Sequence, residues 1–208
     1  MKLDRFGSTF QTTEVHENFC SENFEDPGIE NLSEILGVFG GRTFNHGLYR
    51  VFLPKQVPSA ITSIEGVFPE YRGRLVPFGF DWLGRHFACD RARVQDGQPQ
   101  VLLLEIGAGE AMEIPASILD FHNIELVDYM NDALAVEFWE RWRAQNPTDL
   151  SYTECVGYKV PLFLGGDDTL PNLEVIDLNV YVEICGQLRN RVKTLPVGQT
   201  IRSFSMQD

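Results

Sequence analysis

The chain has 208 residues and a formal net charge of −13, with 43% hydrophobic and 23% charged residues. This composition is typical of a folded globular protein and excludes collagen-like, low-complexity and disordered chains. The length fits one large domain or two small ones that are closely joined. The excess of acid argues against direct binding of nucleic acid, because phosphate groups require a basic face, but it leaves basic partners open.

The apolar runs of the chain are short. The longest lies near residues 101–104, far below the roughly 20 residues that span a bilayer, and the first residues contain no continuous apolar stretch. We therefore expect a cytoplasmic protein that does not contact a membrane. The four cysteines form no CxxC motif and are expected to be free, buried thiols: Cys20, Cys89, Cys155 and Cys185.

The first half of the chain begins with a predicted helix. Apolar residues at helical spacing predict this helix over residues 29–39, and the glycine pair 40–41 ends it. A turn at 44–47 leads into a strand at 48–53. A short helix then follows between Pro54 and Pro69.

Three consecutive strands are predicted next, over residues 74–80, 85–90 and 100–106. The links between them are short, and the second contains Asp96-Gly97, a strong hairpin signal. Consecutive strands with short links form an antiparallel meander.

After Glu105 the pattern becomes helical. A short helix is predicted over residues 114–121, and Asn131 or Asp132 caps a longer one. Residues 155–164 form a loop or a strand, and 165–168 a turn. The apolar face of the longer helix consists of Leu134, Phe138, Trp139 and Trp142. Asp177 caps a last helix, whose apolar face consists of Tyr181, Ile184, Cys185, Leu188 and Val192. The fold class is α+β, a meander packed with helices as one compact unit or two tightly joined subdomains.

The charge is concentrated in one part of the chain. Residues 105–188 contain sixteen acids and three bases, and the charges of the remaining residues cancel. Between Glu105 and Glu140 there are nine acids and no Lys or Arg. Such a run is either a solvated face or a docking surface that steers a basic protein into contact.

No motif for catalysis or for a cofactor is present. The histidines His16, His46, His86 and His122 form neither HxH nor HExxH, and residues 107–109 lack the rest of a phosphate-binding loop. The chain has no Gly-x-Ser-x-Gly, and we predict no metal site and no cofactor. Carboxylates are plentiful, so a catalytic pair stays open, but nothing singles one out.

Trp82 lies in the link between two predicted strands, beside Asp81 and Gly84. An exposed Trp in a turn is a binding anchor, because Trp and Arg dominate interface energies. The alternative is a ring that folds back over the sheet.

Four segments carry a family resemblance. Residues 40–50, GGRTFNHGLYR, and 78–85, FGFDWLGR, resemble the signature of the GAD-like domain. Residues 156–166, VGYKVPLFLGG, and 172–188 resemble the C-terminal domain that accompanies it. Together they resemble immunity proteins paired with type VI secretion DNase toxins and, more distantly, the SUKH superfamily of toxin-immunity proteins.

The resemblance implies a GAD-like part over residues 1–107 and an immunity-type helical part over 108–208. It implies a non-enzymatic protein that binds and inhibits a cognate toxin, a basic nuclease, in the producing cell, and it supplies no catalytic residues. The candidate toxin-binding residues are Trp82 and eight acids of the acidic part: Glu110, Glu113, Asp120, Glu125, Asp128, Asp132, Asp167 and Asp168. A regulatory or scaffold module of SUKH-like type and an enzyme of unknown class are the alternatives.

Overall fold

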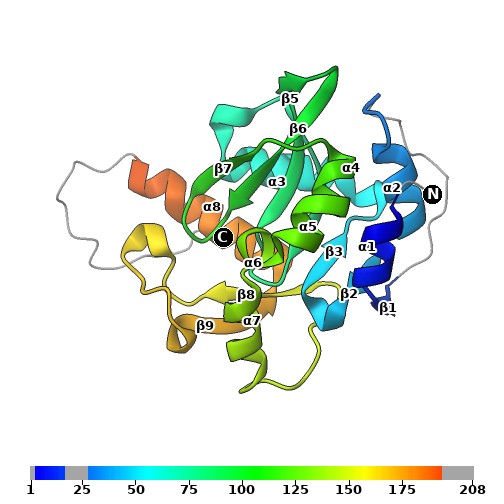
Figure 1. Cartoon of the computed structure of the whole chain (residues 1–208). Coiled ribbons are helices and arrows are strands. Elements are labelled where there is room, and N and C mark those ends of the chain that lie inside the picture. Colours follow the sequence, from blue (N-terminus) through cyan, green and yellow to red (C-terminus); the bar gives the residue numbers. More distant parts are fainter. Residues whose placement is uncertain (1–2, 17–27, 194–208) are drawn as a thin grey trace.

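A seven-stranded sheet forms the centre of the computed structural model, which describes residues 3–16 and 28–193 (Figure 1). All neighbouring strands are antiparallel and follow chain order, so the predicted α+β meander is confirmed. The strands are β1 (Thr12–Val15), β2 (Arg42–Phe44), β3 (Tyr49–Val51), β4 (Leu75–Asp81), β5 (His86–Gln95), β6 (Gln98–Glu105) and β7 (Glu110–Ile114).

Helices cover both faces of this sheet. Behind it in Figure 1 lie α3 (Val57–Val67) and α8 (Leu178–Lys193), which pack on each other. In front of it lies a chain of short helices, residues 118–143, which we call the helical arm. The arm consists of α4 (Ile118–Asp120), a π-helical turn (Phe121–Glu125), α5 (Leu126–Asp128), α6 (Met130–Leu134) and α7 (Val136–Arg143).

The N-terminal helices pack beside the arm at one end of the sheet. Helix α1 (Asp4–Thr9) contacts the arm at α5, and Phe39 at the end of α2 (Leu32–Phe39) packs on Phe6 with the ring centroids 5.4 Å apart. Short 3-10 helices of one turn each lie between the longer elements, at Asn45–Gly47, Pro54–Gln56, Pro69–Tyr71, Leu162–Leu164 and Leu170–Asn172.

A β-bulge in β4 supplies aromatic side chains to both faces of the sheet. The register with β5 shifts between Pro77 and Gly79, so Phe78 and Phe80 point to opposite faces although they are two residues apart. Phe78 packs on Phe121 of the arm, with ring centroids 5.5 Å apart, whereas Phe80 packs on Phe52 on the α3 side, at 4.9 Å. The bulge therefore lets one strand anchor both helical layers.

A second, two-stranded sheet joins α8 to the main body. It pairs β8 (Glu154–Tyr158) with β9 (Leu173–Asp177), which decides the loop-or-strand alternative for residues 155–164. Glycine is required at position 157, because a Cβ there would lie 2.6 Å from the ring of Tyr181 on α8. The carboxylate of Asp177 accepts hydrogen bonds from the backbone N–H groups of Asn179 and Val180, so Asp177 caps α8 as predicted.

Three expectations about local structure need correction. Residues 110–114, adjoining the helix predicted at 114–121, form strand β7, and the helix begins only at Ile118. The longer helix is interrupted at Ala135, whose φ of 51° places it in the left-handed region and splits α6 from α7. Strands β1 and β2 were not predicted, because each has at most four residues and gains its stability from neighbours in the sheet.

One hydrophobic core contains residues from both halves of the chain. The predicted boundary at residues 107 and 108 falls in the turn between β6 and β7, so the sheet extends past it. Within the described ranges, Cys89, Cys155 and Cys185 are free and buried, whereas Cys20 lies outside them. Among the described helices, none is long and apolar enough to cross a membrane.

Candidate docking surface

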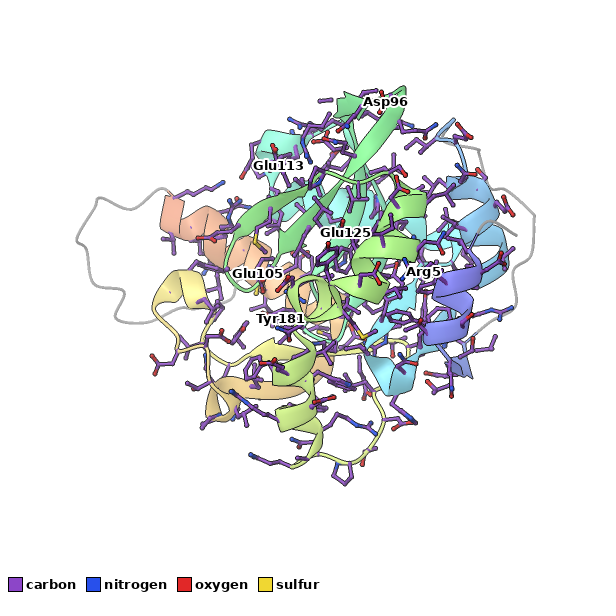
Figure 2. The ribbon with its side chains drawn as sticks, in the orientation of Figure 1. Arg5, Asp96, Glu105, Glu113, Glu125 and Tyr181 are labelled. Atoms are coloured by element: carbon purple, nitrogen blue, oxygen red, sulfur yellow. The ribbon has the colours of Figure 1, made fainter. Side chains whose placement is uncertain are left out.

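The eight predicted acids lie on three parts of the structure, which are strand β7, the helical arm and the turn before β9. Two are on β7, four are on the arm, and two are in the turn before β9: Glu110 and Glu113, then Asp120, Glu125, Asp128 and Asp132, then Asp167 and Asp168. Figure 2 shows Glu113 beside the strands and Glu125 on the arm in front of the sheet. All except Glu125, which is half-buried, are exposed. That these acids bind a toxin stays a prediction.

Two of these carboxylates are engaged by arginines of this chain. Asp128 accepts two hydrogen bonds from the guanidinium of Arg5 on α1, at 2.9 and 2.5 Å, and this pairing lowers the pKa of Asp128. Glu113 lies 3.3 Å from Arg93 of β5 while its side chain stays 70% exposed. The pair at Asp128 fixes α1 against the arm, so its carboxylate is less available to another molecule.

Two further acids hold local structure. The hydroxyl of Tyr158 donates to Asp168 at 2.8 Å, which ties the turn before β9 to β8. Asp120 accepts a hydrogen bond from the hydroxyl of Ser117, whose oxygen in turn caps α4. Each of these carboxylates keeps lone pairs for additional donors.

Four of the eight carboxylates form neither an ion pair nor a side-chain hydrogen bond with the described part of the chain: Glu110, Glu125, Asp132 and Asp167. Unpaired surface acids cost little in water, but they attract a basic partner over about 10 Å at moderate ionic strength. These four are therefore the strongest candidates for contacts with another protein.

Trp82 is wholly buried, so the interpretation as an exposed binding anchor is wrong and the folded-back alternative is observed. Its ring packs against Trp139, with centroids 5.3 Å apart, and against Phe138 at 5.5 Å. Its indole N–H donates to the backbone oxygen of Leu134 at 2.9 Å. Trp82 thus fixes the helical arm to the end of the sheet and supports the candidate surface from beneath.

A buried ion pair that the sequence reasoning missed lies next to Trp82. The Arg85 Nε donates to the carboxylate of Asp81 at 2.6 Å, and both side chains are almost wholly buried. Another N–H of Arg85 reaches the backbone oxygen of Ala133 on the arm at 3.1 Å. The sequence did contain a sign of this ion pair, because Asp81 and Arg85 are four residues apart across the tight link between β4 and β5.

Glu105 extends this charged network toward the surface. Its carboxylate lies 3.7 Å from Arg85, and the side chain is 15% exposed. Burial raises the pKa of Glu105 to about 7, although the charge of Arg85 acts in the opposite direction. Figure 2 places Glu105 and Tyr181 close to the centre of the view, behind the arm.

A cleft of about 350 Å³ opens beside the arm. It is lined by residues of α6 and α7 and by one residue of the turn before β9: Asn131, Ala135, Glu137, Phe138, Arg141 and Asp168. The guanidinium of Arg141 stacks over the ring of Phe138, 5.1 Å from its centroid. The cleft is thus polar and carries both signs of charge, which suits contacts with a protein surface better than an apolar ligand.

Two histidines and two cysteines are buried inside the fold. Burial lowers the pKa values of His86 and His122 to about 4, and it raises those of Cys89 and Cys185 to about 12. Reactive thiols require the opposite shift. The cavity beside His86, between the sheet and the α3–α8 layer, measures about 70 Å³. Across residues 3–16 and 28–193, no group of three or more His, Cys, Asp or Glu side chains could hold a metal ion.

Comparisons with known proteins find a family likeness in the C-terminal part of the chain. Residues 121–189, about a third of the chain, match the family model described as T6SS immunity protein Tdi1, C-terminal. The chain also resembles the crystal structure of Atu4351 from Agrobacterium tumefaciens, with 17% identity and a TM-score of 0.48 over 80% of this chain and 83% of that one. A comparison with curated proteins finds no match. Residues 121–189, which contain most of the helical arm, β8, β9 and most of α8, are therefore similar to the family described as T6SS immunity protein Tdi1, C-terminal.

Proposed function

We propose that this chain is an immunity protein that binds a secreted bacterial toxin inside the producing cell and blocks its activity, and that the toxin is a basic nuclease acting on DNA. The observation that carries the proposal is the match of residues 121–189 to a type VI secretion immunity family. We also propose that the N-terminal part is a GAD-like domain and that the protein is cytoplasmic.

The acidic side supports the proposal because a nuclease carries a basic surface that binds phosphate. An acidic inhibitor competes for that surface, and opposite charges accelerate the encounter of the two proteins. Glu125 and Asp132 of the arm have no ion pair within the described residues; Glu125 is half-buried and Asp132 is exposed. The chain needs no catalytic group for such a role, since occupying the toxin or holding it in an inactive form suffices.

Co-expression with the toxin encoded by the adjacent gene tests the proposal. We expect cells that carry both genes to survive and the two proteins to elute together from a sizing column. Cells that die, with no complex on the column, would overturn the proposal.

Charge reversal tests the surface. The double variant Glu125→Lys/Asp132→Lys changes the charge of the arm, and the control Glu34→Lys/Glu183→Lys makes the same change on exposed positions of α2 and α8. We expect association at low salt to slow about tenfold for the arm variant and much less for the control. Equal slowing of both variants would contradict a specific role for the arm.

A further inference from the structure

Strand β7 is a terminal strand of the large sheet, and its outer edge is uncovered. One side of β7 pairs with β6. On the other side, the backbone N–H and C=O groups of residues 110–113 have no hydrogen-bond partner among the described residues. Figure 1 shows β7 at the margin of the sheet. An edge of this kind presents a row of N–H and C=O groups that can pair with another strand.

The other terminal strands are less suited to pairing. The register of β1 is interrupted by an irregularity between Thr12 and Glu14, and such bulges turn an edge away from pairing. Strands β8 and β9 form a sheet of two strands, and Val156 of β8 already donates its backbone N–H to the backbone oxygen of Trp82 at 2.6 Å. Strand β7, by contrast, keeps an unbroken register of five pairs with β6.

The side chains of β7 define what could pair with it. Glu110 and Met112 stand opposite Glu105 and Leu103, so they share one face of the sheet, and Glu113 lies on the other face. Met112 is 45% exposed and Glu113 is 70% exposed. A strand added at this edge therefore meets a carboxylate on each face and an apolar side chain between them.

We propose that an extended basic segment of the toxin adds to the sheet along the outer edge of β7. This inference rests on the proposed function and names the mode of binding. Main-chain hydrogen bonds supply affinity in such complexes, and side chains of alternating direction supply specificity. The segment carries Lys or Arg facing Glu110 and Glu113 and an apolar residue facing Met112. Strand β7 itself carries two acids and no base, and Glu113 stays 70% exposed beside Arg93, so the edge favours a basic strand over a second copy of this acidic chain.

Hydrogen exchange measured by mass spectrometry tests the pairing directly. The full chain is compared alone and in its complex with the toxin from the adjacent gene. We expect exchange within residues 110–114 to slow about tenfold or more in the complex, and exchange within 173–177 on β9 to stay unchanged. A complex that forms without protecting 110–114 overturns this inference and leaves the proposed function standing. If no complex forms, both fall.

Charge reversal on β7 provides a second measurement. The variant Glu110→Lys/Glu113→Lys is compared with Glu174→Lys/Glu183→Lys, which makes the same charge change at exposed positions of β9 and α8. We expect Kd to rise about tenfold or more for the β7 variant and less than about threefold for the control, with unchanged far-UV circular dichroism. Equal effects of the two variants would contradict pairing at β7.

Discussion

Replacing Trp82 tests how the helical arm is held against the sheet. The ring is wholly buried among Phe138, Trp139 and Trp142, and its N–H donates to the backbone oxygen of Leu134. Truncating a buried Trp to Ala removes these contacts and leaves a cavity, which costs about 3–5 kcal/mol. We expect Trp82→Ala to lower the free energy of unfolding by this amount, or to prevent folding if the protein is less stable than that.

A second substitution separates the hydrogen bond from the packing. Trp82→Phe keeps an aromatic ring but leaves the buried oxygen of Leu134 without its donor, which costs about 1–3 kcal/mol. For a chain of this size, each kcal/mol lowers Tm by about 2–4 °C.

Urea denaturation followed by far-UV circular dichroism measures both variants, because this signal does not depend on Trp82. The control is Tyr129→Ala, since Tyr129 is 53% exposed and its loss should change stability by less than about 0.5 kcal/mol. A Trp82→Ala protein within about 1 kcal/mol of the unmodified chain would refute the assignment of Trp82 to the core and restore the surface interpretation.

Three further predictions concern buried charge. Asp81→Asn leaves the buried Arg85 with the more distant Glu105 as its counter-charge and should cost about 3–5 kcal/mol in urea denaturation. A loss below about 1 kcal/mol would count against the ion pair. Because burial raises the pKa of Glu105 to about 7, the folded state binds an extra proton between about pH 4.5 and 7, and stability from this group declines as pH rises through that window. Glu105→Gln should remove the decline, so the variant should gain on the unmodified chain between pH 5 and 7; parallel pH curves would contradict this. The low pKa values of His86 and His122 act in the opposite direction, because the unfolded chain binds more protons than the folded one between about pH 4 and 6.5. The free energy of unfolding should therefore fall as pH drops through this range, most clearly in the Glu105→Gln variant. A flat profile in that variant would show that the two rings are not buried as neutral groups.

The sequence predicted the elements whose signals are local. Asp96-Gly97 marks a hairpin because both residues adopt positive φ, at 51° and 78°, and the turn joins β5 to β6 as expected. Asp177 caps α8 because its carboxylate needs only the next two or three N–H groups. Such features depend on a few consecutive residues and are visible without the fold.

The features that the sequence missed depend on tertiary contacts. Strand β7 pairs five residues with β6, and this pairing overrides a sequence of Glu, Ala, Met, Glu and Ile that favours a helix as readily as a strand. The break at Ala135 allows α7 to place Trp139 against Trp82, a contact that no local pattern reveals. The partner of Asp81 could be suspected from spacing, but its burial could not.

The candidate surface stays a prediction, and only part of its description is visible in the sequence. Counting charges along the chain finds the acid-rich segment, because residues 105–140 carry nine acids and no Lys or Arg. The count could not show that Arg5 engages Asp128 from the far N-terminus, nor that Trp82 lies beneath the arm. Which carboxylates remain available follows only from contacts between distant segments.

Titrating the toxin's own activity with the purified chain is the most direct test of inhibition by binding. The toxin from the adjacent gene is assayed for cleavage of DNA while this chain is added from zero to two equivalents. We expect inhibition by binding, with toxin activity that falls in proportion to the added chain and is abolished near one equivalent. Full activity at two equivalents, with no complex on a sizing column, would contradict it.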